Sequence, residues 1–444
     1  MNILMTALCL EKAGSHVVAL TLASGMAQRH RVYFFNQGEQ LVDEGMVKLY
    51  LNPAVRLLDM TSFPRLNWLG WKLNGLLTRV GYHGFHEKLK TLTMAYAIWR
   101  YNIDLVHGHE IMTRTTRLTK LARWLKVPVV ITDHNGYSML RKVGDSSFIP
   151  YANLARAIVA VSHYTADIFR YGNAAEDTAQ LRALGQRILA ADHEAEYKSL
   201  RGQAAPTSDV ALTVPVEVIY NGMQRQPSGL PTGAAVRAEL GIGPDAFVVG
   251  MAGRGTEQKG WRTALAAYLR LKQQFPARQF AWLCMGEGAC LREIKAELGT
   301  RHPDIHLLGS VDNPHYYMAA CNVGLVPSSF SEGLPLCVLE FYEHGAPVIG
   351  SNLCGIPEVI EPVDHAPAGQ LIEMDEALVP RVDSLLRHLI TYVEQPELLR
   401  QHGEAARDLR LRFDMEPFVA AHERLYERVL IGPSFSINSS VASH

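Results

Sequence analysis

The sequence predicts an α/β protein made of two doubly wound domains, each with a parallel sheet between layers of helices. The chain has 444 residues, which is too long for one ordinary hydrophobic core. Short β-branched runs alternate with helical patterns in both halves, and this alternation is typical of parallel strands joined by crossover helices. A segment rich in proline and glycine, residues 226–233, separates the two series and is the best linker candidate.

The first alternating series extends to about residue 220. An apolar run at 2–8 predicts the first strand, and a helical pattern led by Ser15 follows it. Ligands of such sheets bind at the carboxyl ends of the strands, so the loops at 13–15, 107–110 and 133–136 are the candidate positions. The other strands expected in this half are Arg31–Phe35, Val47–Leu51, Asp104–His107, Val127–Thr132, Ile158–Val161 and Val216–Tyr220.

The second series begins after the linker. Its expected strands are Phe247–Met251, Phe280–Met285, Ile305–Leu308, Val323–Val326 and Pro347–Gly350. Helical patterns at Val382–Phe413, broken near Pro396, and at Pro417–Leu430 close the fold. The predicted N-terminal domain is residues 1–225, with a helical insertion at about 172–213, and the predicted C-terminal domain is residues 226–413. A final helix at 414–431 follows, and the serine-rich tail at 432–444 is expected to be disordered.

Composition restricts the class of protein further. The 43 basic and 44 acidic side chains nearly balance, which argues against a bulk nucleic-acid partner. The six cysteines lack paired short spacings and lie mostly in apolar runs, which favours reduced thiols in the cytoplasm over a disulfide or zinc framework. The N-terminus lacks the basic region of a signal peptide, and no segment reaches the roughly eighteen apolar residues of a membrane helix. We therefore expect a soluble, cytoplasmic protein that touches a membrane only at its surface.

Residues 327–358 carry the strongest local signal for chemistry. Small residues end an apolar run, and a helix is expected to begin at Leu334-Pro335. Its unpaired amides and its dipole favour an anion. Glu332 and Glu340, eight residues apart, are suited to accept hydrogen bonds from hydroxyls. An anion between hydroxylated groups, such as a nucleotide diphosphate sugar, fits this arrangement; the alternative is a capping Glu332 and a solvated Glu340.

A second candidate loop follows the first strand of the second half. Residues 250–260 contain Gly253, Arg254, Lys259 and Gly260. Glycines let a backbone come close to a ligand, and two cations can converge on one phosphate pair. Alone the loop is weak evidence, but its expected position on the same sheet edge as Glu332 strengthens the prediction of a phosphate site.

These residues together resemble a known family. Arg254, Lys259-Gly260, Glu332-Gly333-Leu334-Pro335 and Glu340 are similar to the motifs, including E-x7-E, of GT-B glycosyltransferases, specifically the retaining group called family 4. The segments DLVHGHE, PVVITDH, AIVAVSHYTADIF, VEVIYNGM and CGIPEVI resemble that family in order and spacing. The resemblance covers most of residues 1–430. It implies two Rossmann-like domains facing a central cleft, with a C-terminal helix that crosses back to the N-terminal domain.

The resemblance also implies roles for individual residues. In similar enzymes the residues matching Arg254 and Lys259 bind the donor diphosphate and stabilise the leaving group. The residue matching Glu332 holds hydroxyls of the donor sugar, and the one matching Glu340 binds the ribose. A histidine matching His134 lies beside the transferred sugar. The remaining donor contacts are expected at Gly14, Gly253, Val311, Gly333, Leu334 and Pro335.

The implied reaction is transfer of a sugar, with retained anomeric configuration, from a nucleotide donor to a hydroxyl of a glycan or a lipid-linked acceptor. The chain contains no Asp-x-Asp, which agrees with metal-independent chemistry and no cofactor; Arg254, Lys259 and the helix dipole would act instead. Two rivals share the architecture: a sugar-nucleotide epimerase or phosphorylase, and a non-catalytic partner in glycan assembly. A dinucleotide oxidoreductase is disfavoured because no G-x-G-x-x-G follows the first strand.

For each of four features, the sequence leaves two interpretations open. Gly14 either contacts phosphate, which we favour, or caps its strand, and its loop lacks the second glycine and the glutamate of similar proteins. His107 and His109 either approach an acceptor or are buried structural groups, which we favour. The aromatic and basic stretch at 62–90 either meets an anionic membrane or is an ordinary helix pair that buries its aromatics, which we favour. The 172–213 insertion is an acceptor-side or oligomer element, or merely surface helix.

Overall fold

The structure is a computed structural model of the full chain. It describes residues 1–38, 41–83, 85–109, 112–136, 140–141, 146–172, 210–226, 229–329 and 332–431, with the backbone alone at 86–87 and 112–117. Two segments predicted from the sequence lie largely or wholly outside these ranges: the helical insertion, of which 173–209 are not described, and the tail at 432–444.

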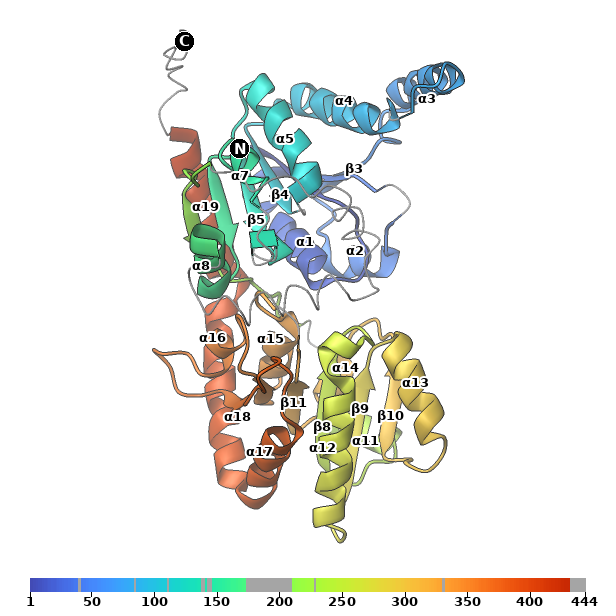
Figure 1. The fold of residues 1–444 in the computed structure, drawn as a ribbon, viewed down its shortest axis with the longest axis vertical. Helices are drawn as coiled ribbons and strands as arrows, with labels where there is room; N and C mark the ends of the chain where they lie inside the picture. The colour runs from blue at the N-terminus through green and yellow to red at the C-terminus, as the bar shows by residue number, and fades with distance from the viewer. Residues whose placement is uncertain are drawn as a thin grey trace.

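The first domain contains a seven-stranded sheet, and every strand pair in it is parallel (Figure 1). Its order is β3-β2-β1-β4-β5-β6-β7, so the chain moves outward from β1 to one edge and then from β4 to the other. The change of direction between β1 and β4 is where doubly wound sheets bind ligands. The strands are β1 (Asn2–Ala7), β2 (Arg31–Asn36), β3 (Arg56–Leu58), β4 (Leu105–His109), β5 (Val129–Asp133), β6 (Ala157–Ala160) and β7 (Val216–Val218).

One expected strand of this domain is wrong. The stretch at 47–51 belongs to helix α2 (Glu44–Tyr50), and the edge strand is β3. The Asp43 side chain accepts a hydrogen bond from the Met46 amide at 2.7 Å and so caps this helix. The other helices that the structure describes in this domain are α1 (Gly14–Met26), α3 (Pro64–Arg79), α4 (Phe85–Arg100), α5 (Met112–Leu125), α7 (Ile149–Ala152) and α8 (His163–Tyr171).

The second domain repeats the same topology with six parallel strands in the order β10-β9-β8-β11-β12-β13. The strands are β8 (Phe247–Ala252), β9 (Phe280–Met285), β10 (Ile305–Gly309), β11 (Val323–Val326), β12 (Val348–Ser351) and β13 (Gly369–Ile372). The helices are α11 (Gly233–Glu239), η2 (Glu257–Lys259), α12 (Trp261–Gln274), α13 (Ala289–Leu298), α14 (His315–Met318), α15 (Leu336–Glu343), α16 (Pro357–Ile360), α17 (Val382–Glu394), α18 (Pro396–Arg410) and η3 (Leu411–Phe413). The sequence prediction missed β13, which has only four residues.

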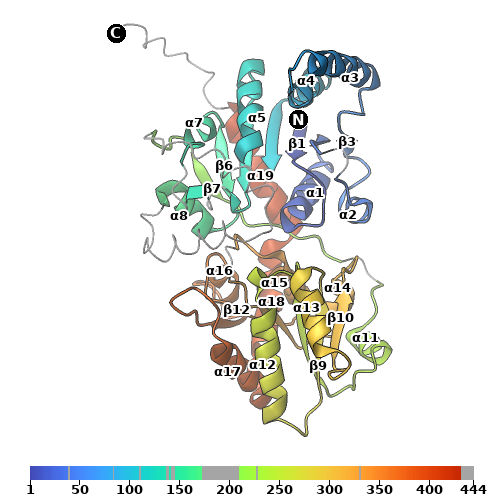
Figure 2. The ribbon, with the colours of Figure 1, turned by 45° about the vertical axis from the view of Figure 1, so that its right-hand side comes forward.

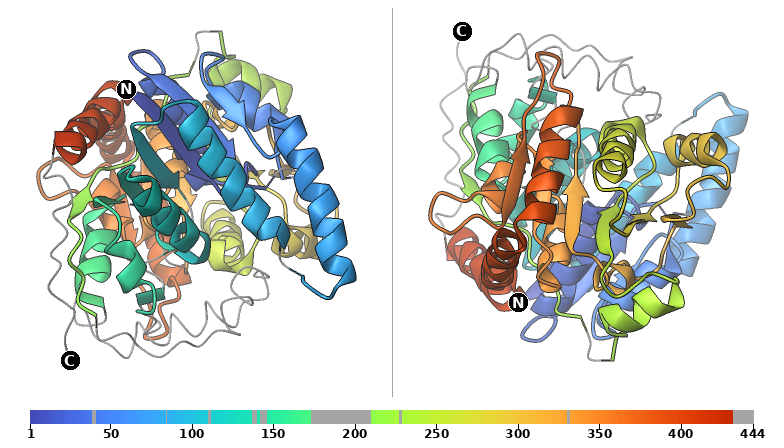
Figure 3. Two further views of the ribbon diagram at one scale, coloured as in Figure 1. Left: turned by 90° about the horizontal axis from the view of Figure 1, so that it is seen from above. Right: turned by 90° about the horizontal axis from the view of Figure 1, so that it is seen from below.

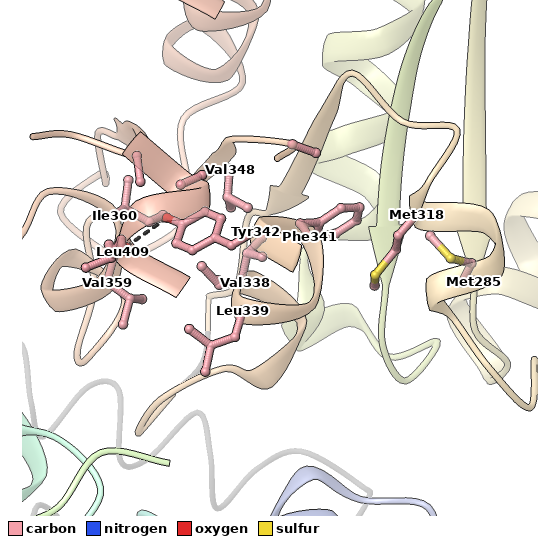
Figure 4. Packing of buried hydrophobic residues seen from close by; sticks show 14 of the residues in the cluster. Met285, Met318, Val338, Leu339, Phe341, Tyr342, Val348, Val359, Ile360 and Leu409 are labelled. Atoms are coloured by element: carbon pink, nitrogen blue, oxygen red, sulfur yellow. Dashed lines mark hydrogen bonds between the residues drawn. The ribbon is translucent and has the colours of Figure 1, made fainter. Parts of the chain in front are cut away.

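Helices cover both faces of each sheet (Figure 3), and apolar cores fill the layers between them. Helix α15 shows how a core positions a functional element. Its Phe341 and Tyr342 are fully buried, and the Tyr342 hydroxyl donates to the Val359 carbonyl at 2.8 Å (Figure 4). These contacts hold α15 against the sheet with its first residue, Leu336, at the carboxyl edge.

The last helix, α19 (Met415–Ile431), crosses back to the first domain, as predicted (Figure 2). It packs so closely on α1 that a Cβ on Gly25 would lie 2.4 Å from Val419 Cγ2. The Tyr426 hydroxyl lies 2.5 Å from His107 Nδ1, inside the first domain. The two-domain α/β architecture is therefore confirmed.

The chain passes between the domains twice, and the two crossings are joined. The Met223 amide donates to the Phe413 carbonyl at 2.8 Å. The Asp414 carboxylate pairs with Arg225 at 2.6 Å and with the buried Arg410 at 2.5 Å. The domain ranges proposed from the sequence, divided at residues 225 and 226, stay a prediction.

The six cysteines form no disulfide with one another. In the described ranges, no helix is both long and apolar enough to span a bilayer.

Candidate functional site

The carboxyl edges of the two sheets face and touch each other. A Cβ on Gly14, at the start of α1, would lie 3.6 Å from Leu336 Cδ1, at the start of α15. A Cβ on Gly333 would lie 2.9 Å from Val161 Cγ2, just after β6. The loops that follow β1 and β11 therefore meet, and each lies at the point where its own sheet changes direction. Such crevices are the usual ligand sites of doubly wound sheets.

The loop after β8 is held against the loop after β11 by a glycine. Gly260 has φ 79°, and a Cβ there would lie 1.9 Å from the Pro327 carbonyl oxygen. Only glycine fits such a left-handed position this close to another backbone. The Ser329 amide donates to the Gln258 carbonyl at 2.8 Å and continues the contact. This approach brings Lys259 next to Glu332.

Lys259 and Glu332 form an ion pair, with 2.5 Å between Nζ and Oε1. The Ser328 hydroxyl donates to the same carboxylate oxygen at 3.0 Å. Both charged side chains are mostly shielded, with exposed fractions of 23% and 13%. Arg254 differs: it is exposed, and its guanidinium makes no ion pair or hydrogen bond with a residue that the structure describes. Of the two cations in the predicted phosphate site, Lys259 is thus paired with Glu332, and Arg254 is available to bind a ligand.

The start of α15 offers backbone donors at the same edge. Pro335 is the N-cap residue, in an extended conformation, and no side chain caps the helix. Gly333 and Leu334 are buried just before it. Uncapped amides together with the helix dipole favour a bound anion. The helix begins one residue after the expected Leu334-Pro335 start.

Glu340 and Cys337 lie further along α15. Glu340 is partly buried and has no hydrogen-bonding or ionic partner in the described part of the chain. Burial raises the pKa of its carboxyl to about 7. Burial also raises the pKa of the Cys337 thiol to about 12, more strongly than Lys259 lowers it. Cys337 therefore stays protonated near pH 7 and is no nucleophile.

His134 follows β5 and faces the Gly333 loop through its neighbour Asn135. Asn135 has φ 92°, its amide donates to Asp133 at 2.9 Å, and its Cβ would lie 3.2 Å from a Cβ on Gly333. His134 Nε2 lies 3.1 Å from His109 Nδ1. Burial lowers the pKa of His134 to about 3 and that of His109 well below its usual value. Both rings are neutral, and one hydrogen bond joins them.

His107 is a structural residue, as favoured from the sequence. It is fully buried, and its two ring nitrogens contact Tyr426 and Thr132 at 2.5 Å and 2.7 Å. His109 was given the same interpretation, yet its contact with His134 places it beside the candidate site. A signal was present: β4 and β5 are neighbours, so residues at their carboxyl ends meet.

The remaining predicted residues lie around this centre. Gly253 has φ 154°, and a Cβ there would lie 3.9 Å from the Lys259 side chain. Val311 lies partly buried in the loop after β10. Its neighbour Asp312 pairs with Lys12 of the first domain at 2.9 Å. The structure thus joins Lys259 with Glu332 and brings Gly14 to α15, whereas Arg254 and Glu340 lie nearby without direct contact to the pair.

Glu358 lies outside the set of predicted site residues and has a structural role. Its carboxylate accepts the backbone amides of His163 at 2.9 Å and Tyr164 at 2.7 Å, in the first turn of α8 of the other domain. The Tyr220 hydroxyl also donates to it at 2.9 Å. Glu358 therefore caps a helix across the domain boundary. No local pattern could reveal a partner 195 residues away.

The paired sheets and their facing edges define the class of protein, and comparison with known proteins identifies the family. Residues 13–177 match the family model described as Glycosyltransferase Family 4. Residues 246–388 match the one described as Glycosyl transferases group 1. The chain belongs to the group 1 glycosyltransferases, as the resemblance implied.

Solved structures share the GT-B fold. A glycosyltransferase from Rickettsia africae aligns with a TM-score of 0.68 at 15% identity, covering 97% of this chain and 99% of that one. HepE from Anabaena, solved in complex with UDP and glucose, aligns with a TM-score of 0.64 at 18% identity, covering 96% and 99%. At such identities the likeness concerns the fold.

Curated relatives match over shorter stretches. N-acetyl-alpha-D-glucosaminyl L-malate synthase of Bacillus anthracis is 32% identical over 124 residues, which is 28% of this chain and 30% of that protein. Across the first curated relatives, the matched part spans 14% to 50% of their own length.

Proposed function

We propose that this protein is a retaining glycosyltransferase that moves a sugar from a nucleotide diphosphate sugar to a hydroxyl of a glycan or a lipid-linked acceptor. The observation that carries the proposal is the Lys259–Glu332 pair beside the uncapped start of α15. A cation and helix amides suit the donor diphosphate, and a carboxylate suits the sugar hydroxyls next to it. Arg254 adds a second cation, and no described residue forms an ion pair with it.

Leaving-group stabilisation is the step to which these residues contribute most. Breaking the glycosidic bond develops negative charge on the diphosphate. Arg254, Lys259 and the dipole of α15 can stabilise that charge, which supports chemistry without a metal or cofactor. In this proposal Glu340, on the second turn of α15, binds the ribose of the donor, and Gly14 lets the first loop approach α15.

The ionisation states support retention of configuration. An inverting reaction needs a strong base beside the acceptor hydroxyl. His134 is a poor base because burial lowers its pKa to about 3, and Glu332 is engaged by Lys259. A reaction in which the donor phosphate accepts the acceptor proton needs neither group as a base. His134 then has the role of a neutral contact to the transferred sugar.

The partners follow from this reaction. The donor is a nucleotide sugar, as UDP-glucose is in another structure of HepE. The acceptor is a hydroxylated glycan or lipid-linked sugar, reached at the inner face of the cytoplasmic membrane. Nucleic acid has no role in the reaction.

A donor panel tests the proposal. Purified protein is incubated with UDP-, GDP- and ADP-sugars, with and without glycan acceptors, and nucleotide diphosphate release is measured. Release that depends on an acceptor, with an unchanged anomeric configuration of the product by NMR, is the expected result. Consumption of donor without acceptor would instead favour an epimerase or phosphorylase, and failure to bind any nucleotide sugar by calorimetry would favour a non-catalytic partner.

A further inference from the structure

Helices α3 and α4 form a pair at the end of the first domain that lies opposite the second domain (Figures 1 and 2). Of the sixteen residues of α3, only Gly70 is buried. The two helices touch there, because a Cβ on Gly70 would lie 2.4 Å from the Leu89 side chain. Helix α3 packs chiefly on α4, so its apolar side chains are not part of a core. An exposed apolar helix face of this kind marks an interaction surface.

The exposed apolar residues of α3 follow a helical repeat. Leu69, Leu73 and Leu76 of α3 and Val80, which directly follows the helix, are spaced by four, three and four residues, so they form one stripe. Their exposed fractions are 59%, 42%, 58% and 74%, far above those of a core-facing stripe.

Helix α4 carries a second stripe of the same kind. Leu92, Tyr96 and Trp99 are exposed and spaced by four and three residues. On α3, Trp68 and Trp71 are also exposed, at 59% and 49%. The interpretation favoured from the sequence, in which this helix pair buries its aromatics, is therefore wrong for these tryptophans.

Positive charge borders the apolar stripe. Arg65, Lys72 and Arg79 are exposed, recur every seven residues on one side of α3, and share that helix with no acidic residue. The Lys72 ammonium lies 3.9 Å from the Trp68 ring centre, a cation–π distance. Helix α4 adds Lys88, Lys90 and Arg100 against the single acid Glu87.

The tryptophans divide by domain. Trp261 and Trp282 of the second domain are fully buried, whereas the four tryptophans of the first domain are exposed; they are Trp68, Trp71, Trp99 and Trp124. Exposed tryptophan beside cations and leucines is the composition of segments that lie in a bilayer interface.

We propose that α3 and α4 form a docking surface for a bilayer containing anionic lipid. The two helices would lie in the interface plane, with leucines and tryptophans in the headgroup boundary and the cations on lipid phosphates. A second copy of the chain would fit this surface less well. In a two-fold symmetric contact, the cations Arg65, Lys72 and Arg79 of one copy would face the same three cations of the other and repel them. This inference rests on the proposed function. Docking would bring the first domain to a lipid-linked acceptor in the membrane.

Vesicle co-sedimentation of the full chain tests the docking. Phosphatidylcholine vesicles with and without phosphatidylglycerol are compared at low salt and at 0.5 M salt. At the higher concentration the Debye length is about 4 Å, so attraction between exposed charges is screened. Binding should require the anionic lipid and weaken severalfold at high salt. The variant R65Q/K72Q/R79Q should bind about a hundredfold more weakly, at about fivefold for each cation. The variant L69Q/L76Q should bind the vesicles at least about tenfold more weakly, because it removes two apolar side chains from the boundary between headgroups and acyl chains.

A matched control removes three exposed cations of the second domain, as R270Q/R292Q/K295Q, and should bind like the wild type. The proposal would be overturned if the protein did not bind anionic vesicles at low salt. It would also be overturned if the control variant lost as much vesicle binding as R65Q/K72Q/R79Q. A dimer in light scattering that L69Q/L76Q dissociates would also overturn it, by assigning the surface to a second copy. Docking and catalysis are separable. Lys259→Met should lower transfer by at least about a hundredfold without changing sedimentation, and R65Q/K72Q/R79Q should keep transfer to a soluble acceptor.

Discussion

Replacing Lys259 by methionine tests the central assignment. Methionine keeps most of the side-chain length but removes the charge that pairs with Glu332 at 2.5 Å. If Lys259 stabilises the leaving diphosphate, the loss of one preorganised donor should lower kcat by about 10²- to 10³-fold, or about 3–4 kcal/mol.

The same substitution has a smaller effect on stability. The two side chains are 23% and 13% exposed, so the pair lies between a surface ion pair, worth about 0–1 kcal/mol, and a buried one whose disruption costs about 3–5 kcal/mol. Ser328 still donates to Glu332, so we expect unfolding to become easier by about 1–2 kcal/mol. The activity loss should therefore exceed what partial unfolding explains.

The assay is acceptor-dependent release of nucleotide diphosphate, beside urea unfolding of the same preparations. Lys295→Met, which changes an exposed lysine on α13, is the matched control and should behave like the wild type. Because Lys259 and Glu332 touch, Lys259→Met with Glu332→Gln should lose less than the product of the single losses. A Lys259→Met enzyme with activity within about fivefold of the wild type would refute the assignment.

Three further substitutions follow from the geometry. Burial raises the pKa of Glu340 from its ordinary 4.5 to about 7, so ionising it costs folded stability as the pH rises from about 4.5 to 7. Glu340→Gln should stabilise the ligand-free protein by up to about 3 kcal/mol at pH 8 and by nothing at pH 4, in urea unfolding; a pH-independent effect would contradict this. Glu358→Ala removes the cap across the domain boundary, so it should lower stability by about 0.5–2 kcal/mol and raise the radius of gyration in small-angle scattering; an unchanged scattering curve would argue against a role in domain closure. Gly260→Ala should disrupt the contact with Pro327 and weaken nucleotide binding at least about tenfold by calorimetry, and normal affinity would show that the loop tolerates a side chain.

The positions of most strands could be predicted from local residues. Phe280–Met285 and Val323–Val326 agree with β9 and β11 because strands buried on both faces of a parallel sheet are continuous apolar runs. The segment at 47–51 failed because a short half-buried helix and a short strand share the same residue types, although Asp43 carried the capping signal. The strand β13 is as short as β11, but it begins with Gly369 and Gln370 and so lacks the continuous apolar run that marks β11.

For the candidate site, the sequence predicted the participating residue types and the loops that carry them. Arg254, Lys259 and Glu332 lie in the connections that follow β8 and β11, and Glu340 lies on the second turn of α15. Their roles stay a prediction. The pairing of Lys259 with Glu332 could not be predicted, because it depends on the approach of two loops whose paired residues lie 73 positions apart.

The family, the doubly wound α/β class and the glycine loop with its two cations follow from the sequence, because local patterning and short motifs are encoded in neighbouring residues. Three features come from the tertiary structure alone: the Lys259–Glu332 pair, the cap that Glu358 provides to the other domain, and the exposure of Trp68. Each depends on which distant segments pack together or leave a face uncovered. The sequence pattern of an amphipathic helix is the same whether or not a partner covers its apolar side. Only the folded chain shows that Trp68, Leu69 and Leu76 of α3 remain exposed among the residues that the structure describes.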